Sequence, residues 1–206
     1  MAQLHFNDLT NKHRRLLTSL AWQSIEIGMT HHRPLSVGVE EYPVPLQSKT
    51  AAFITIKIDG VLRGCMGSLE AKRPLVQDIV ENAFAAAFRD TRFSPLTHAE
   101  LDEISIELSL LTEMQALDIA NEQGLKNILR PNIDGLMIQE GNKQATFLPQ
   151  VWQEIPDCET FIQQLKREAG LSDSHWSDNI KCWRYQVHSL TNRSRSEGRR
   201  IESKWR

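Results

Sequence analysis

The sequence predicts an α+β protein with a largely antiparallel sheet and packed helices. Strand-like segments come in pairs joined by glycine-containing turns, and amphipathic helical segments separate these pairs. The chain has 206 residues, is 40% hydrophobic and carries a net charge of −2. These values are typical of a globular protein with one sizeable core, or a core with a small satellite lobe.

The first element is expected to be a helix from about Asp8 to Gly28, because apolar residues recur there at steps of three and four. Gly28 and Pro34 are expected to end it. Residues 33–50 contain three prolines and show no sustained period. We expect an irregular connection over this stretch.

Residues 51–67 predict a β-hairpin. The β-branched segment AAFITIKI is followed by Asp59-Gly60, a pair that suits a two-residue turn with positive φ, and then by VLRGCMG. A regular register across this turn places Arg63 opposite Ile56 and Cys65 opposite Ile54. Arg63 and Cys65 are therefore expected beside an isoleucine stripe.

The later elements follow from the same rules. Pro74 is expected to open a buried helix through residue 90, and residues 104–112 alternate apolar and polar side chains as a half-buried strand does. The remaining predicted elements are a short helix at 121–130, a second hairpin around Gly141-Asn142, a helix capped by Asp157 and ended by Gly170, and a strand at 180–190.

Arg63 and Cys65 are the first candidates for chemistry. A guanidinium on an apolar face needs a carboxylate, carbonyl groups or an anionic ligand, since leaving it buried and unpaired costs about 3–5 kcal/mol. For Cys65, burial predicts an inert structural thiol, whereas a nearby cation would favour a reactive thiolate. Both roles of Cys65 stay open.

The turn explains Gly60 but not Gly64 or Gly67. Inside a strand these two glycines indicate a bulge or the close approach of a ligand, with helix packing as the competing cause. In the loop after the long helix, Asp90 is expected either to lie in a solvated turn or, like Glu107, to pair with Arg63 or orient a ligand.

Several classes of protein have no support in the sequence. The seven histidines and three widely spaced cysteines show no metal-binding spacing, and no nucleotide-binding or hydrolase motif occurs. No secretory signal or run of about 20 apolar residues is present, so we expect no membrane partner and a cytoplasmic, reducing location. The sequence names no cofactor.

The segment 191–206 differs from the rest of the chain. It carries six Lys and Arg residues against two Glu residues, a local charge of +4. A mobile solvated tail is one expectation, and contact with RNA or an acidic partner is the other.

Four segments resemble one protein family. LRGCMGSL at 62–69, DTRF at 90–93, ISIELSLLT at 104–112 and GLMIQEGNKQATFLPQV at 135–151 are similar to the AMMECR domain, whose prokaryotic members are called protein A of the AmmeMemoRadiSam system. The likeness extends over about residues 8–190. It implies one domain over 1–190 with a larger and a smaller lobe, a ligand-binding cleft between them, and association with Memo-type and radical S-adenosylmethionine proteins.

The resemblance also selects candidate residues. The candidates for catalysis are Cys65, Asp90 and Glu107. The candidates for binding a ligand are Arg63, Gly64, Gly67, Ser68, Arg92, Pro149 and Gln150. Thr91 stands where the family often has proline, and Ser68 stands where threonine is usual.

The resulting hypothesis is a protein that binds an anionic small molecule or modified substrate, with Arg63 as the anchor and Cys65 at the floor of the cleft. Asp90, Arg92 and Glu107 are expected to orient Arg63 or the substrate. A cysteine-dependent enzyme is one form of this hypothesis. The alternative is a non-catalytic adaptor that binds a partner protein or RNA.

Overall fold

The computed structural model of the chain describes residue 6 and residues 9–192. The chain divides into two compact units, one made of the residues up to Leu111 together with those from His188 onward, the other of Thr112–Val187. Of the predicted basic tail, only Thr191 and Asn192 belong to the described residues. Among all the described residues, no helix is long and apolar enough to cross a membrane.

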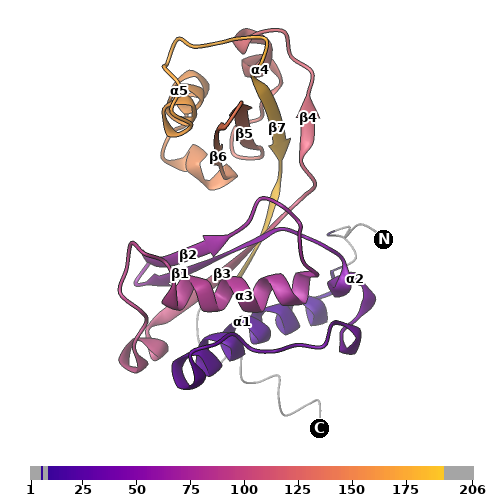
Figure 1. Cartoon of the computed structure of the whole chain (residues 1–206), viewed down its shortest axis with the longest axis vertical. Helices are drawn as coiled ribbons and strands as arrows, with labels where there is room; N and C mark the ends of the chain where they lie inside the picture. Colours follow the sequence, from indigo (N-terminus) through magenta and orange to yellow (C-terminus); the bar gives the residue numbers. More distant parts are fainter. Residues whose placement is uncertain (1–5, 7–8, 193–206) are drawn as a thin grey trace. The chain divides into compact units, whose positions relative to one another are not determined.

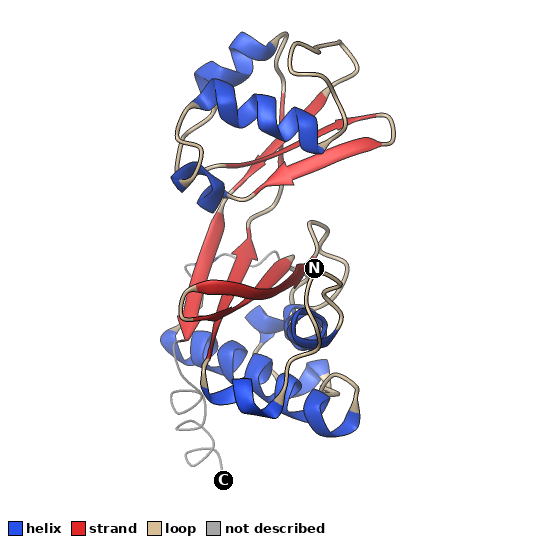
Figure 2. Ribbon diagram, turned by 90° about the vertical axis from the view of Figure 1, so that its left-hand side faces the viewer, coloured by secondary structure: helices blue, strands red, loops and turns tan. Residues whose placement is uncertain are grey.

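The first unit packs two long helices against one sheet. The helices are α1 (Asn11–His31) and α3 (Leu75–Phe88), and both lie along the same face of the sheet (Figures 1 and 2). The shorter helical segments are η2 (Val39–Glu41), α2 (Val44–Gln47) and η3 (His98–Asp102). The strands, in spatial order, are β2 (Val61–Gly67), β1 (Ala52–Ile58), β3 (Ile104–Leu111) and β8 (Val187–Asn192).

Helix α1 begins and ends three residues later than predicted. The Thr10 hydroxyl caps it by accepting a hydrogen bond from the His13 N–H, at 3.2 Å. At the other end His32 adopts a left-handed conformation with φ 54°, and its N–H donates to the Gly28 carbonyl. Gly28 therefore lies inside the last turn, and His32 provides the cap that the sequence rules assign to glycine.

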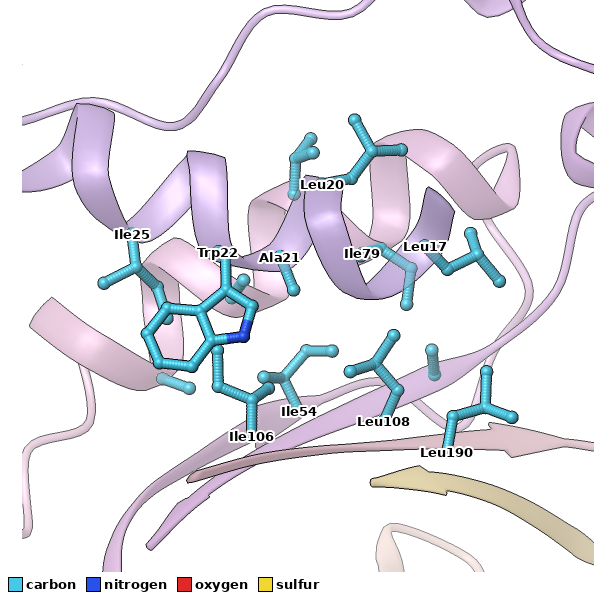
Figure 3. Close-up of a cluster of buried hydrophobic side chains, with 14 of the residues drawn as sticks. Leu17, Leu20, Ala21, Trp22, Ile25, Ile54, Ile79, Ile106, Leu108 and Leu190 are labelled. Carbon is cyan, nitrogen blue, oxygen red and sulfur yellow. The ribbon is translucent and has the colours of Figure 1, made fainter. Parts of the chain in front are cut away.

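The core of the first unit lies between α1, α3 and the sheet. Figure 3 shows Trp22 and Ile25 of α1 pointing toward Ile54 and Ile106 of the sheet. These four side chains are at most 3% exposed. The isoleucines of β1 and β3 thus face the helices, and the opposite face of this sheet carries no helix of the described part of the unit.

The β1–β2 hairpin has the predicted turn but not the predicted register. Asp59 and Gly60 both have positive φ, at 50° and 82°, and Ile58 pairs with Val61. Lys57 still pairs with Leu62, but beyond this pair the register shifts. Gly64 therefore pairs with Ile56, and Cys65 pairs with Thr55. This irregularity moves Cys65 from the expected isoleucine face to the helix-free face.

Close packing accounts for both strand glycines. A Cβ atom at Gly64 would lie 2.1 Å from the Ala86 carbonyl oxygen of α3. A Cβ atom at Gly67 would lie 2.4 Å from the Phe53 ring. Since any side chain at these positions would overlap its neighbours, the contacts explain Gly64 and Gly67 without a ligand.

The second unit packs helix α5 (Cys158–Glu168) against a second antiparallel sheet (Figures 1 and 2). Its strands, in spatial order, are β4 (Gln115–Leu117), β7 (Lys181–Tyr185), β5 (Gly135–Glu140) and β6 (Lys143–Phe147). Helix α4 (Glu122–Ile128) and segment η4 (Pro149–Gln153) complete it. The indole ring of Trp152 stacks on Phe161 at 3.7 Å in its core.

The predicted α+β class with antiparallel sheets is confirmed. The second hairpin is also confirmed, with the pairing Glu140–Lys143 on either side of the turn. The single strand expected at 180–190 is wrong, because the chain divides it at Gln186 into β7 and β8, which belong to different sheets.

Candidate functional site

The helix-free face of the first sheet carries a row of polar side chains across three strands. Cys65 of β2 pairs with Thr55 of β1, and Thr55 pairs with Glu107 of β3. The Cys65 Sγ lies 3.4 Å from the Thr55 Oγ1, and the Lys57 Nζ lies 3.1 Å from the Glu107 Oε2. We call Cys65, Thr55, Glu107 and Lys57 the polar row.

Asp90 holds the backbone of Cys65. Its Oδ2 accepts the Cys65 N–H at 2.8 Å, and its side chain is nearly buried, with 7% of the residue exposed. Hydrogen bonds from Arg92 hold the pKa of Asp90 well below its usual range. Burial acts against this lowering of the pKa, and the hydrogen bond from the Cys65 N–H adds to it. A general acid or base near neutral pH needs a raised pKa, so Asp90 is suited to positioning the strand.

Arg92 is the cation that contacts Cys65. Its Nε and Nη2 donate to the two Asp90 oxygens at 2.9 and 2.6 Å, and Nη2 also lies 3.3 Å from the Cys65 carbonyl oxygen. The pKa of Arg92 is raised, first by its hydrogen bonds to Asp90 and further by the Cys65 side chain. The Arg92 side chain is 57% exposed, so an ion in solution can reach it.

Arg63 is engaged elsewhere. Its Nε and Nη2 donate to the Glu100 carboxylate at 2.7 and 3.2 Å, and its Nη1 donates to the Ser94 carbonyl at 2.9 Å. The expectation that Asp90 or Glu107 pairs with Arg63 is therefore wrong. The predicted need for a carboxylate and carbonyls is met within the protein, because the bulge directs Arg63 toward the loop after α3.

Sequence reasoning missed Glu100, although a signal for it was present. Thr97 and Glu100 form a capping box at the start of η3, in which Glu100 accepts the Thr97 N–H and hydroxyl, both at 2.8 Å. Together with Arg63, the first cause, these contacts lower the pKa of Glu100 to about 2. The T-x-x-E spacing predicts the cap but not the arginine.

Phe93 connects the two arginines. The centre of its ring lies 6.0 Å from the Arg63 Cζ and 5.5 Å from the Arg92 Cζ, which permits weak cation–π contacts. The candidate residues of 62–69 and 90–93 thus come together in space, in the arrangement Arg63, Phe93, Arg92, Cys65.

The other predicted ligand-binding residues have local roles or belong to the second unit. The Ser68 hydroxyl accepts the Glu70 N–H at 3.1 Å within a tight turn. Pro149, which is buried, and Gln150 belong to η4 of the second unit. Their part in a site, like that of the cleft implied by the resemblance, stays a prediction.

The three cysteines are free and differ in environment. Cys65 and Cys158 are half-buried and Cys182 is buried. Burial raises the pKa of Cys182 to about 12 and, with smaller charge effects, raises that of Cys158. Within the residues that the structure describes, no three His, Cys, Asp or Glu side chains are grouped to hold a metal ion.

Comparison with known proteins identifies the family of the chain. The family model AMMECR1 matches residues 18–190, which include every candidate residue. The chain belongs to the AMMECR1 family. A protein of Methanothermobacter thermautotrophicus is 30% identical over 186 residues, or 89% of this chain and 96% of that protein. A protein of Sulfolobus acidocaldarius is 34% identical over 187 residues, or 87% and 81% of the two chains.

A solved structure has the same fold as this chain. The crystal structure of a protein from Pyrococcus horikoshii superimposes with a TM-score of 0.80 at 26% identity, covering 87% of this chain and 91% of that one. The fold of this chain is thus found in an experimental structure.

Proposed function

We propose that this AMMECR1-family protein binds an anionic small molecule, or an anionic group of a modified substrate, beside Cys65 on the helix-free face. Arg92 is the anchor for the anion, and Cys65 is the candidate nucleophile. Asp90 positions both by binding the Cys65 N–H and the Arg92 guanidinium. Arg92 thus replaces Arg63 as the proposed anchor.

One observation carries the proposal: an exposed guanidinium contacts the backbone of Cys65, whose side chain is half-buried. Arg92 uses Nε and Nη2 for its contacts with Asp90 and Cys65, while the side chain stays 57% exposed. Arg63, by contrast, is 15% exposed and satisfied by Glu100 and carbonyl oxygens. Of these two arginines, Arg92 can therefore receive an anion at much lower cost.

The polar row supplies further groups for a ligand. Thr55 lies between Cys65 and Glu107, and the Lys57–Glu107 pair is half-buried beside them. These side chains alternate along β1 and β3 with the isoleucines of the core, which is the sequence signal that predicts them. A substrate with both an anionic group and hydrogen-bonding groups would fit this surface.

The test measures thermal unfolding of the full chain at constant ionic strength with phosphate, pyrophosphate or succinate. We expect at least one of these anions to raise the melting temperature of the wild type but not of Arg92→Gln. Arg73→Gln is the matched control, because Arg73 also pairs with a buried aspartate, Asp78, and is 41% exposed. Equal responses in wild type and Arg92→Gln would contradict the proposal.

The expected association with Memo-type and radical S-adenosylmethionine proteins belongs to the same proposal. It is supported by membership of the family and implies that the bound group is a product or precursor of a shared modification. Co-purification of the full chain with these proteins, compared between wild type and Arg92→Gln, tests it. An association that needs residues 191–206 but not Cys65 or Arg92 would favour the adaptor instead.

A further inference from the structure

Strand β2 is the end strand of its sheet. It pairs with β1 on one side, and the sheet order β2-β1-β3-β8 leaves its other side without a neighbouring strand among the described residues. The backbone N–H and C=O groups of such an edge strand can pair with an extended segment of another chain. Proteins that stay monomeric block this pairing in some specific way.

At Cys65 the edge is already occupied by side chains. The Cys65 N–H donates to the Asp90 Oδ2 at 2.8 Å, and the Cys65 carbonyl accepts from the Arg92 Nη2 at 3.3 Å. A carboxylate therefore takes the place of a neighbouring strand's carbonyl, and a guanidinium takes the place of its N–H. The bulge beside Arg63 further disturbs the edge on the turn side.

The pair is held in this arrangement before any partner arrives. Asp90 also accepts the Arg92 backbone N–H at 3.2 Å and the Arg92 Nε at 2.9 Å. Because Asp90 is nearly buried and its carboxylate is stabilised by these donors, the pair stays charged at neutral pH. An incoming strand would have to displace several charge-assisted hydrogen bonds.

We propose that the Asp90–Arg92 pair caps the edge of β2 at Cys65 and excludes an extended segment, in particular β2 of a second copy of this chain. The strand needs such a cap because Val61 and Leu62, at its start, are 70% and 38% exposed. Two apolar side chains on an uncapped edge favour self-association. A substrate consequently reaches the thiol from the helix-free face and not by strand addition.

The experiment measures the molar mass of the full chain by size-exclusion chromatography with light scattering, over a hundredfold range of concentration. We expect the wild type to stay monomeric, and Asp90→Ala and Arg92→Ala to form dimers or larger species as concentration rises. Asp134→Ala is the matched control. Asp134 is a fully buried aspartate paired with Arg130 that accepts the Arg130 N–H within a turn, away from any sheet edge.

A second substitution ties the association to β2. Adding Leu62→Lys to the Asp90→Ala chain puts a charge on the edge and should restore the monomer. Circular dichroism shows which variants are folded, and if Asp90→Ala unfolds, Arg92→Ala carries the test, since its side chain is 57% exposed. Folded, monomeric Arg92→Ala, or equal association of Asp134→Ala, would overturn the proposal. The readout does not depend on anion binding.

Discussion

Three buried aspartates share one arrangement at the residue scale. Each accepts a backbone N–H and pairs with an arginine nearby in the sequence. The three pairs are Asp78 with Arg73, Asp90 with Arg92, and Asp134 with Arg130. A buried carboxylate that is satisfied in this way fixes the backbone locally, and only the Asp90 pair fixes it beside a cysteine.

The pH dependence of stability tests the Glu100 contacts. The pKa of Glu100 falls from its ordinary 4.5 to about 2 on folding, so its carboxylate stabilises the protein above pH 4.5 and this contribution is lost as the pH falls toward 2. Glu100→Gln should cost about 2 kcal/mol at pH 7 and much less at pH 3. Urea unfolding at the two pH values measures the difference.

Wild type and Glu100→Gln must be compared with each other because other groups also titrate in this pH range. Burial raises the pKa of Asp78, so its contribution to stability changes with the opposite sign. A stability difference between wild type and Glu100→Gln that stays constant from pH 7 to pH 3 would contradict the role given to Glu100.

The ion pairs Arg63–Glu100 and Lys57–Glu107 should contribute different amounts to stability. Arg63→Gln should lower the free energy of unfolding by about 2 kcal/mol, because the variant leaves Glu100 and the Ser94 carbonyl without their charged donor. Lys57→Gln, in a pair whose lysine is 38% exposed, should cost about 0.5 kcal/mol. Urea unfolding at pH 7 measures both, and equal costs would contradict the structural role of Arg63.

At the scale of elements, the β1–β2 hairpin shows how far sequence reasoning extends. The turn was predictable because Asp59-Gly60 suits positive φ, a local property of two residues. The register was not, because the bulge has no signal in the turn residues and lies next to Gly64, which approaches Ala86 of α3 closely. The face that carries Cys65, and with it the candidate site, thus follows from the register of the folded strand and not from the turn alone.

Gly64→Ala tests the packing of β2 on α3. The new Cβ would lie 2.1 Å from the Ala86 carbonyl oxygen, a backbone atom that cannot move alone. We expect a loss of about 3 kcal/mol in urea unfolding. Gly124→Ala in α4 is the control, since its nearest neighbour atom is 3.6 Å away and alanine favours a helix. A neutral Gly64→Ala would contradict the packing explanation.

At the scale of the whole molecule, the second unit is one continuous segment with its own core. Residues 112–187 contain the stacked Trp152 and Phe161 and all four strands of their sheet. We expect a fragment of these residues to unfold cooperatively, as followed by circular dichroism in urea. A fragment without a cooperative transition would show that its core depends on the first unit.

Sequence patterns predicted the class of the molecule better than its site. Helices, hairpins and most caps depend on residues close in sequence, and these predictions were largely confirmed. The division of residues 180–190 between two sheets, and the pairing of Arg63 with Glu100, depend on contacts across the fold. The proposed site therefore uses the predicted residues Cys65, Asp90 and Arg92, with Arg92 in place of Arg63 as the anchor and Asp90 as a positioning residue.

The central claim is that Arg92 presents a positive charge to anions beside an accessible Cys65. It is tested most directly by mass spectrometry of the alkylation rates of Cys65, Cys158 and Cys182 in the folded protein, with neutral iodoacetamide and anionic iodoacetate. We expect Cys65 to react first and Cys182 only on unfolding, because burial raises its pKa to about 12.

The ratio of the iodoacetate rate to the iodoacetamide rate isolates the charge effect. At Cys65 this ratio, normalised to Cys158, should fall about fivefold in Arg92→Gln, since one charge near the thiol contributes about 1 kcal/mol at a solvated site. An unchanged ratio, or a Cys65 that reacts only when the chain unfolds, would contradict the account.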